Sequence, residues 1–257
     1  TGFAAETTSG DAVPLDTWPL AYWPDGSLKW TGHAVGANSA LAEAVDLAPG
    51  QPAAPDSPVS VDENPGRVRI STGVITVDVN KNGKSIIQRI TREGRDLAVE
   101  GKLVLLLQDG PTPEDGLGTV TTREFGGFVE NVTVEYSGPV RAVVKVEGRY
   151  HGHRNRRWLP FTVRMYFYAG AESVRIVHGF IFDGDKDSDF IRGLGLRWSV
   201  PMSDPLQDRH IRFVGEDDGI WGEAVRVVSG LRRDPGPAAR NPQFNGVATP
   251  PQNHRGG

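Results

Sequence analysis

The sequence contains no cysteine, and this absence removes several kinds of structure and chemistry. The 257 residues can form no disulfide, no thiolate zinc site and no thiol nucleophile, so apolar packing must supply the stability. No apolar run approaches the roughly 18 residues of a membrane-spanning helix, and no basic stretch followed by an apolar one opens the chain. We therefore expect neither a membrane span nor a signal peptide in this chain. Because the chain begins with Thr1 and not Met, these absences leave the compartment of the parent protein open, secretion included.

A surplus of charge of one sign is also missing. Lys and Arg number 28 against 32 Asp and Glu, which gives a formal net charge of -4 at pH 7. Such a surface has no overall positive field that would gather a polyanion, so nucleic acid is not an expected partner. The chain also has no G-x-S-x-G elbow, no phosphate-cradling G-x-x-x-x-G-K-[ST] and no H-E-x-x-H motif. Hydrolase, nucleotide-binding and zinc-protease functions therefore lose their usual support.

Glycine and proline are plentiful instead. The chain has 32 Gly and 19 Pro without a period, a pattern typical of turns between many short strands. From Arg67 onward the sequence predicts strands at short intervals, and several alternate with period two, which indicates one buried and one solvated face. An all-β chain with an antiparallel β-sandwich is therefore predicted. The predicted strands are Val68 to Val79, Ser85 to Ile90, Leu103 to Leu107, Phe128 to Tyr136, Val140 to Tyr150, Leu159 to Tyr168 and Ser173 to Phe182.

The first strong segment is a predicted hairpin from Trp18 to Val35, with its turn at Pro24-Asp25-Gly26-Ser27. Its tryptophans, Trp18, Trp23 and Trp30, alternate with small residues. This alternation favours packing in a core over an exposed platform for sugar rings.

Two stretches with little periodicity predict linkers. Leu47 to Pro65 is rich in Pro, Ala, Asp and Ser, which predicts a domain boundary near residue 64. Pro235 to Gly257 is rich in Pro, Gly, Asn and Gln and has no apolar period, which is typical of an outgoing linker.

Four aspartates alternate in the sequence FDGDKDSDF: Asp183, Asp185, Asp187 and Asp189. Alternate acidic residues can converge on one hard cation, as in the first part of a calcium loop, although the glycine and distal glutamate of an EF-hand are not at the required positions. A solvated acidic turn is the favoured interpretation. A structural calcium site is the alternative.

A second polar cluster occupies the sequence HGHRNRR. His151 and His153 are two apart, so on a continuing strand they would share one face and could bind a metal with a third ligand. Arg154, Arg156 and Arg157 carry planar guanidinium groups that suit sugar carboxylates. An exposed hairpin turn explains the same residues and is the favoured interpretation.

Two parts of the sequence resemble a known family. AYWPDGSLKW, from Ala21 to Trp30, resembles the hallmark WPDGSxKW of the N-terminal barrel domain in the exo-rhamnogalacturonan lyase and YetA-like family. Phe161 to Pro201, followed by Asp208 to Val225, resembles the central β-sandwich of that family. Together these segments cover roughly residues 13 to 235.

The resemblance implies a three-part enzyme with a small β-barrel, a β-sandwich and an α/α toroid that houses most of the lyase site. We accordingly expect an incomplete N-terminal β-barrel and linker over residues 1–64, a central β-sandwich over 65–235, and a linker over 236–257 toward a toroid outside this sequence. The expected function is the non-catalytic β-domain portion of a polysaccharide lyase that cleaves rhamnogalacturonan-type pectin by β-elimination, inactive by itself.

β-Elimination from a galacturonosyl residue needs a positive group at the C6 carboxylate, a base for the C5 proton and an acid for the leaving oxygen. Ion pairing at an inter-domain face competes with substrate contact as the role of charged residues here, and no catalytic residue is assigned. The expected partners are an acidic polysaccharide and the protein's own α/α toroid. On the basis of the resemblance, the candidates for substrate contact are His178, Arg192, Arg197, Asp208, Arg209 and His210.

Two other functions stay in consideration. A stand-alone carbohydrate-binding module would bind acidic pectic fragments without cleaving them. A structural β-sandwich protein would neither bind nor cleave. Joint exposure of Phe213, Ile220 and Trp221 would favour the lyase portion, because a docked domain would cover that apolar surface.

Overall fold

The computed structural model confirms an all-β chain. It describes residues 2–37, 44–111, 120–205, 209–214 and 220–224, together with Pro237, Asn241 and Asn245. Contacts divide the chain into two compact units, residues 1–201 and 202–257. No helix among the described residues has the length and apolar character needed to cross a membrane.

The N-terminal strands form two small sheets. The first has the order β2-β1-β5 and buries Ala5, Val13 and Leu15. The second is the hairpin β3-β4. In the described residues these sheets do not close on each other, so this region is an incomplete barrel as expected. The strands are β1 (Phe3–Thr7), β2 (Ala12–Val13), β3 (Leu15–Tyr22), β4 (Leu28–Val35) and β5 (Val45–Pro49).

The β3-β4 hairpin turns where the sequence predicts. The Trp23 N–H donates to the Ser27 carbonyl at 2.8 Å, and the Asp25 carboxylate accepts from the Ser27 N–H at 2.9 Å. Gly26 has a φ of 84°, a left-handed conformation that glycine adopts without steric cost.

The prediction that the hairpin tryptophans pack in a core is wrong for two of the three. Trp23 is 50% exposed and Trp30 is 63% exposed. A two-stranded sheet has no further layer to cover both of its faces, so aromatic side chains near its tip stay in solvent. Only Trp18 is packed, against Tyr136 and beneath the Arg141 guanidinium, which lies 3.6 Å from its ring centroid.

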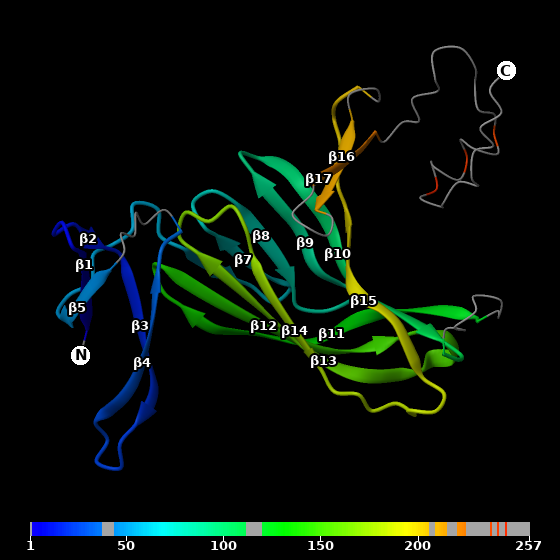
Figure 1. The fold of residues 1–257 in the computed structure, drawn as a ribbon, viewed down its shortest axis with the longest axis horizontal. Helices are drawn as coiled ribbons and strands as arrows, with labels where there is room; N and C mark the ends of the chain where they lie inside the picture. Colours follow the sequence, from blue (N-terminus) through cyan, green and yellow to red (C-terminus); the bar gives the residue numbers. More distant parts are fainter. Residues whose placement is uncertain are drawn as a thin grey trace. The chain divides into compact units, whose positions relative to one another are not determined.

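The central part of the chain forms one ten-stranded sheet. Its strand order is β14-β13-β12-β11-β10-β9-β8-β7-β6, and β15 pairs with the second edge of β10 (Figure 1). The strands are β6 (Ser60–Glu63), β7 (Arg67–Ser71), β8 (Thr76–Asn80), β9 (Ser85–Arg92), β10 (Arg95–Gln108), β11 (Thr122–Ser137), β12 (Arg141–His151), β13 (Arg157–Tyr168), β14 (Arg175–Phe180) and β15 (Phe190–Ser199).

One predicted strand is in fact a hairpin. The segment Val68 to Val79 divides into β7 and β8, because Gly73 turns the chain with a φ of 88°. The Thr72 hydroxyl fastens this turn, since it accepts a hydrogen bond from the Ile75 N–H at 3.1 Å. The alternation of Val and Ile continues on both sides of the turn, which is why the sequence suggests one strand.

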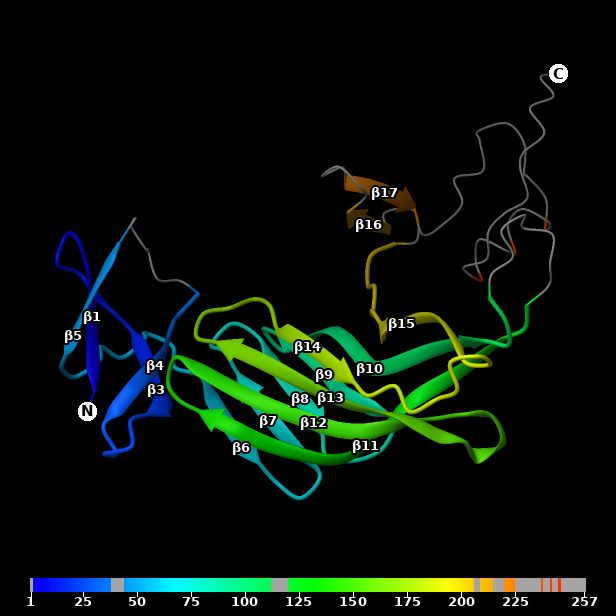
Figure 2. The same ribbon diagram turned by 60° about the horizontal axis from the view of Figure 1, so that its bottom comes forward.

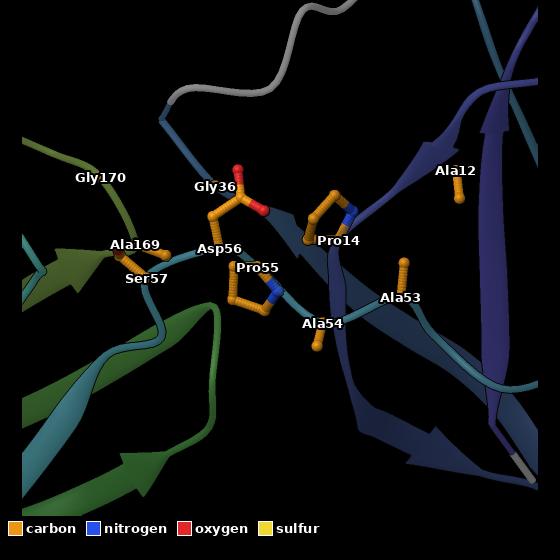
Figure 3. Close-up of a pocket in the computed structure, with 10 residues that line it drawn as sticks. All are labelled: Ala12, Pro14, Gly36, Ala53, Ala54, Pro55, Asp56, Ser57, Ala169 and Gly170. Carbon is orange, nitrogen blue, oxygen red and sulfur yellow. The ribbon is translucent and has the colours of Figure 1, made fainter.

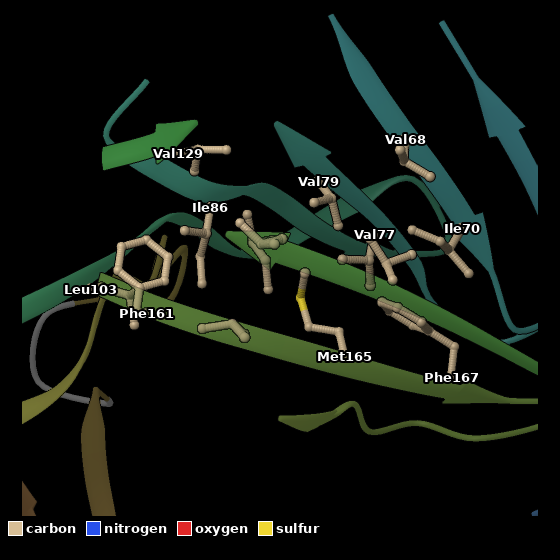
Figure 4. Packing of buried hydrophobic residues seen from close by; sticks show 14 of the residues in the cluster. Val68, Ile70, Val77, Val79, Ile86, Leu103, Val129, Phe161, Met165 and Phe167 are labelled. Atoms are coloured by element: carbon tan, nitrogen blue, oxygen red, sulfur yellow. The ribbon is translucent and has the colours of Figure 1, made fainter. Parts of the chain in front are cut away.

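The large sheet folds over on itself and becomes a sandwich. Strands β6 to β10 form one layer and β11 to β14 the other, and Figure 2 shows the two layers crossing. The inward side chains form one shared core. Figure 4 shows Met165 and Phe167 of β13 pointing toward Val77 and Ile70 of the opposite layer. Alternating burial along β12 and β13 supplies this core, as period-two strands require.

β10 and β11 join the two layers. Residues of β10 up to Lys102 pair with β9, whereas those from Val104 onward pair with β11. The register shifts next to Gly101, and Glu100 has a φ of 54°, which marks a β-bulge. The bulge bends β10 from one layer toward the other.

A buried carboxylate attaches the N-terminal hairpin to the sandwich. Asp16 of β3 accepts hydrogen bonds from the Val140 and Arg141 N–H groups at 3.0 and 2.7 Å. Burial raises the pKa of Asp16, and the two backbone donors oppose that rise. These contacts explain why the first unit includes both the hairpin and the sandwich.

The second unit contains a short antiparallel pair, β16 (His210–Val214) and β17 (Ile220–Ala224). Phe213, Ile220 and Trp221 lie on these strands, but the exposure of their side chains is outside what the structure describes. The predicted linker over residues 236–257 is likewise described only at Pro237, Asn241 and Asn245.

The contrast between exposed and buried tryptophans can be tested with one kind of substitution. Trp158 is 2% exposed, so Trp158→Ala should lower the free energy of unfolding by about 3–5 kcal/mol. Trp30→Ala deletes an indole that is exposed to solvent and should change the free energy of unfolding by no more than about 0.5 kcal/mol. Denaturant unfolding of both variants measures the difference. Equal losses would mean that Trp30 is covered in the protein.

Candidate functional site

Two pockets of equal volume, about 330 Å³, differ sharply in their chemistry. The first lies between Pro14, Gly36, the segment 53–57 and Ala169-Gly170, and Figure 3 shows its lining of small residues and prolines. Among the described residues that line it, Asp56 is the only one with a charged side chain. The second lies on the sandwich and carries several cations, so we treat it as the candidate site and call it the cationic pocket. It is lined by Lys84, Lys102, Leu103, Val104, Glu124, Gly126, Phe128, His151, Gly152 and Arg197.

The cationic pocket forms where β10 and β11 each change partner. Lys102 directly follows the bulge of β10, and a second register shift lies between Val129 and Asn131 of β11. Phe128 precedes that second shift by one residue. β-Bulges re-aim the side chains beside them, so two irregular strands supply the pocket lining that regular ones would not.

Like charges stand opposite each other across two of its strands. Lys102 of β10 and Arg197 of β15 are direct register partners, an arrangement that costs stability unless counterions are near. Arg197 donates two hydrogen bonds to Glu124, both at 2.8 Å, and Lys102 lies 3.0 Å from Glu100.

Lys84, the third cation, directly precedes β9. It is exposed and forms no ion pair with the described residues. Counting the lining residues alone, three cations face one carboxylate, Glu124. The pocket is therefore positive within a protein of net negative charge.

His151 and Phe128 form a flat pair on the same pocket. Their rings are stacked with centroids 4.8 Å apart and an interplanar angle of 4°. The register places Gly126 opposite His151, so Phe128 is the diagonal neighbour of the histidine. The Nε2 atom of His151 is buried and has no hydrogen-bond partner among the described residues.

The ionisation of the pocket follows from these contacts. Burial, with smaller contributions from Arg157 and Lys84, lowers the pKa of His151, whereas Glu130 acts in the opposite direction. The imidazole is therefore neutral at neutral pH and has one donor and one acceptor nitrogen. The hydrogen bonds from Arg197 hold the pKa of Glu124 below its usual value, so that carboxylate stays charged.

The candidates for substrate contact are not brought together at one place. His178 is on β14, within an aromatic group that includes Tyr150 and Phe161, and burial lowers its pKa. Arg192 is exposed on β15 and forms no ion pair with the described residues. Arg197 alone lines the cationic pocket.

Three further candidates belong to the second unit. The Arg209 Nε donates to the Asp204 carbonyl at 2.6 Å. His210 begins β16, and Asp208 lies outside the described residues. Their roles toward a substrate stay predictions.

The four alternating aspartates serve separate local contacts. Asp183 accepts from the Leu159 N–H at 2.6 Å, Asp185 from the Asp187 N–H at 2.9 Å, and Asp187 lies 2.7 Å from the Lys186 amine. Asp189 forms a bidentate ion pair with Arg156 at 2.6 Å. No group of three or more described His, Asp or Glu residues is arranged to hold a metal ion, so the calcium prediction gains no ligand set.

The HGHRNRR segment forms the end of β12 and a short turn. A 3₁₀ helix, η1 (His153–Asn155), separates His153 from His151, so the two rings do not share a strand face. Arg154 and Arg157 are exposed, as a solvated turn predicts. Arg156 differs, because its guanidinium pairs with the buried Asp189 and lies 4.1 Å from the Trp158 ring centroid.

Sequence reasoning missed four side chains of the cationic pocket: Lys84, Lys102, Glu124 and Phe128. They come from three separate segments and follow no motif, so no local spacing connects them. The only local signal is the Asn82-Gly83 turn, which predicts a chain reversal beside Lys84. Gly83 accepts a hydrogen bond from the Val129 N–H at 2.8 Å, and this contact holds that turn against β11.

Fold and site together define a two-layer β-sandwich that follows a small open β domain and bears a cationic pocket. The family model for the PcRGLX-like protein central beta sandwich domain matches residues 59–256, and that for the PcRGLX-like N-terminal RIFT barrel domain matches residues 1–50. The chain therefore belongs to the PcRGLX-like family of rhamnogalacturonan lyase-like proteins, which confirms the resemblance. The boundaries predicted at residues 64 and 235 stay predictions.

A curated relative has the same two regions in a much longer chain. The uncharacterized protein YetA of Bacillus subtilis (strain 168) is 29% identical over 239 residues, which are 92% of this chain and 28% of that protein. The chain thus spans little more than a quarter of the length of this relative.

The Arg156–Asp189 pair should control stability in a pH-dependent manner. Hydrogen bonds from Arg156 lower the pKa of Asp189, so the ionised carboxylate stabilises the fold above its unfolded pKa of about 4, and this contribution is lost as the pH falls through the folded pKa. Arg156→Ala removes the bidentate partner of Asp189 and leaves that carboxylate only its hydrogen bond from the Asp185 N–H. Because Arg156 is 38% exposed, the loss at neutral pH should be about 1–2 kcal/mol. The loss should shrink as the pH falls below about 4 toward the lowered pKa of the folded Asp189.

Denaturant unfolding at several pH values measures this effect. Arg192→Ala, which removes an exposed arginine, is the matched control and should change stability by less than about 0.5 kcal/mol. A loss of the same size at every pH would contradict the electrostatic explanation. It would assign the effect to packing of Arg156 on Trp158.

Proposed function

We propose that this chain is the non-catalytic β-domain portion of a polysaccharide lyase that acts on rhamnogalacturonan-type pectin by β-elimination. In this proposal the sandwich binds the acidic polysaccharide, and the α/α toroid implied by the resemblance carries the lyase site. Membership in the PcRGLX-like family supports the polysaccharide class. The observation that carries the proposal is the cationic pocket, whose charge suits a galacturonate carboxylate.

The same pocket supports binding without turnover. Elimination needs charge neutralisation at the carboxylate, a base for the C5 proton and an acid for the leaving oxygen. Lys84, Lys102 and the neutral His151 suit the first two needs. The one carboxyl group of the lining, Glu124, is held ionised by Arg197 and cannot act as the acid at neutral pH. The pocket thus meets the requirements of recognition better than those of the complete reaction.

A stand-alone carbohydrate-binding module is the second candidate function. The exposed aromatic side chains of the β3-β4 hairpin, Tyr22, Trp23 and Trp30, favour it, because exposed rings stack on sugar faces. This function predicts binding of acidic fragments and no cleavage in any longer form of the protein.

Ultraviolet absorbance of the unsaturated uronate product tests the proposal. The 257-residue chain and the same chain extended through the toroid are each incubated with rhamnogalacturonan I oligosaccharides. We expect product from the extended protein alone, because only there are a base and an acid both expected at the substrate.

Each other outcome has a definite meaning. Product from the 257-residue chain would contradict the proposal and place a complete lyase site within it. Product from neither protein, together with binding of the oligosaccharide, would favour the carbohydrate-binding module.

A further inference from the structure

We propose that the cationic pocket is a subsite for one hexuronate ring of the polysaccharide, with the sugar carboxylate at Lys84 and Lys102 and the ring against the Phe128–His151 pair. This inference rests on the proposed function for the source of the ligand. It adds the ligand class and the residues that bind it.

The ion pairs within the pocket leave part of its positive charge uncompensated. Arg197 has its full bidentate partner in Glu124, whereas Lys102 has only the exposed Glu100 and Lys84 has no ion pair among the described residues. Two ammonium groups therefore line the pocket with incomplete compensation. A carboxylate that approached both would form charge-assisted hydrogen bonds and relieve the repulsion between Lys102 and Arg197.

The shape of the pocket suits a ring and not a small inorganic ion alone. Its volume is about 330 Å³, which is at the lower end of the range for small-molecule sites. Phe128 and His151 are half-buried and stacked on each other, so only an outer face of the pair is left to pack on the apolar face of a sugar. Gly126 lies opposite His151, and a Cβ atom there would meet nothing within 4 Å. Gly126 therefore borders open space in the pocket that it lines.

The pocket lining also includes an unsatisfied polar atom, Nε2 of His151, which is buried without a partner in the described chain. A buried nitrogen without a hydrogen bond costs free energy, so most such atoms in proteins are satisfied. A sugar hydroxyl can donate to or accept from a neutral imidazole. Because Nε2 is buried, a ring hydroxyl of the uronate would reach it only after the imidazole turns toward the pocket, and the contact of the carboxylate with the lysines does not depend on that turn.

Calorimetric titration of the 257-residue chain with galacturonate-rhamnose oligosaccharides tests the subsite. We expect Lys84→Ala/Lys102→Ala to weaken binding by about tenfold or more, since each lost charge-assisted hydrogen bond alone is worth roughly that factor. Lys186→Ala, which removes a lysine that is 82% exposed on a loop, is the matched control and should bind like the unchanged protein. The methyl-esterified oligosaccharide keeps the ring but loses the charge, so it should bind the unchanged chain as weakly as the acid binds the double variant.

A second variant tests the pocket by filling it. Gly126→Val places a branched side chain in the open space and should abolish binding, whereas Gly179→Val, on exposed β14, should not. Neither glycine has a positive φ, so valine, a good strand residue, fits both backbones. Thermal unfolding of each variant confirms that the fold is retained.

The outcomes separate this inference from the proposed function. Unweakened binding by the double lysine variant or by Gly126→Val would overturn the subsite, and so would equal binding of the ester and the acid or binding of inorganic phosphate alone. Product from the extended protein would leave the proposed function standing in each of those cases. Failure of the extended protein to cleave, with pocket-dependent binding intact, would overturn the lyase and keep the subsite.

Discussion

The bend of β10 is the constraint on which the rest of the sandwich depends. This strand must hydrogen-bond with β9 in one layer, with β11 in the other and with β15 along its second edge. A flat strand could not serve both layers, and the bulge at Glu100-Gly101 provides the bend. Glycine is required at position 101, because a Cβ atom there would collide with the ring of Trp198. Without the bend, the two layers of the sandwich could not share one core.

The bend of β10 also positions residues that line the cationic pocket. Lys102 lies beside the bulge, and Arg197 faces it from β15. β11 carries Glu124 and Phe128 on either side of the point where its partner changes from β10 to β12. Glu124 and Glu100 offset part of the repulsion between the like charges, and the apolar core that includes Leu103 and Leu105 stabilises the strands that carry them. A stable scaffold of this kind can maintain an arrangement of cations that would be unfavourable by itself.

The sequence predicts some residues of the candidate site but not most of them. Arg197 was a candidate because it lies in a segment that resembles the family, and His151 because a second histidine follows it. Their meeting in one pocket depends on the register of β10 with β15 and of β11 with β12. For the hairpin tryptophans the local pattern is misleading. Their alternation with small residues usually indicates a core, but here it belongs to a two-stranded sheet with no covering layer.

The sequence by itself determined the strand-rich fold, the hairpin turn at Pro24 to Ser27 and the family, since period-two alternation, turn residues and contiguous motifs are local properties of the chain. Tertiary structure decided that Trp158 is buried whereas Trp30 is exposed. It also paired Arg156 with Asp189 and brought the cations of the pocket together. These outcomes depend on residues that are far apart in the sequence. Strand order and register set their distances, and no local pattern encodes either of them.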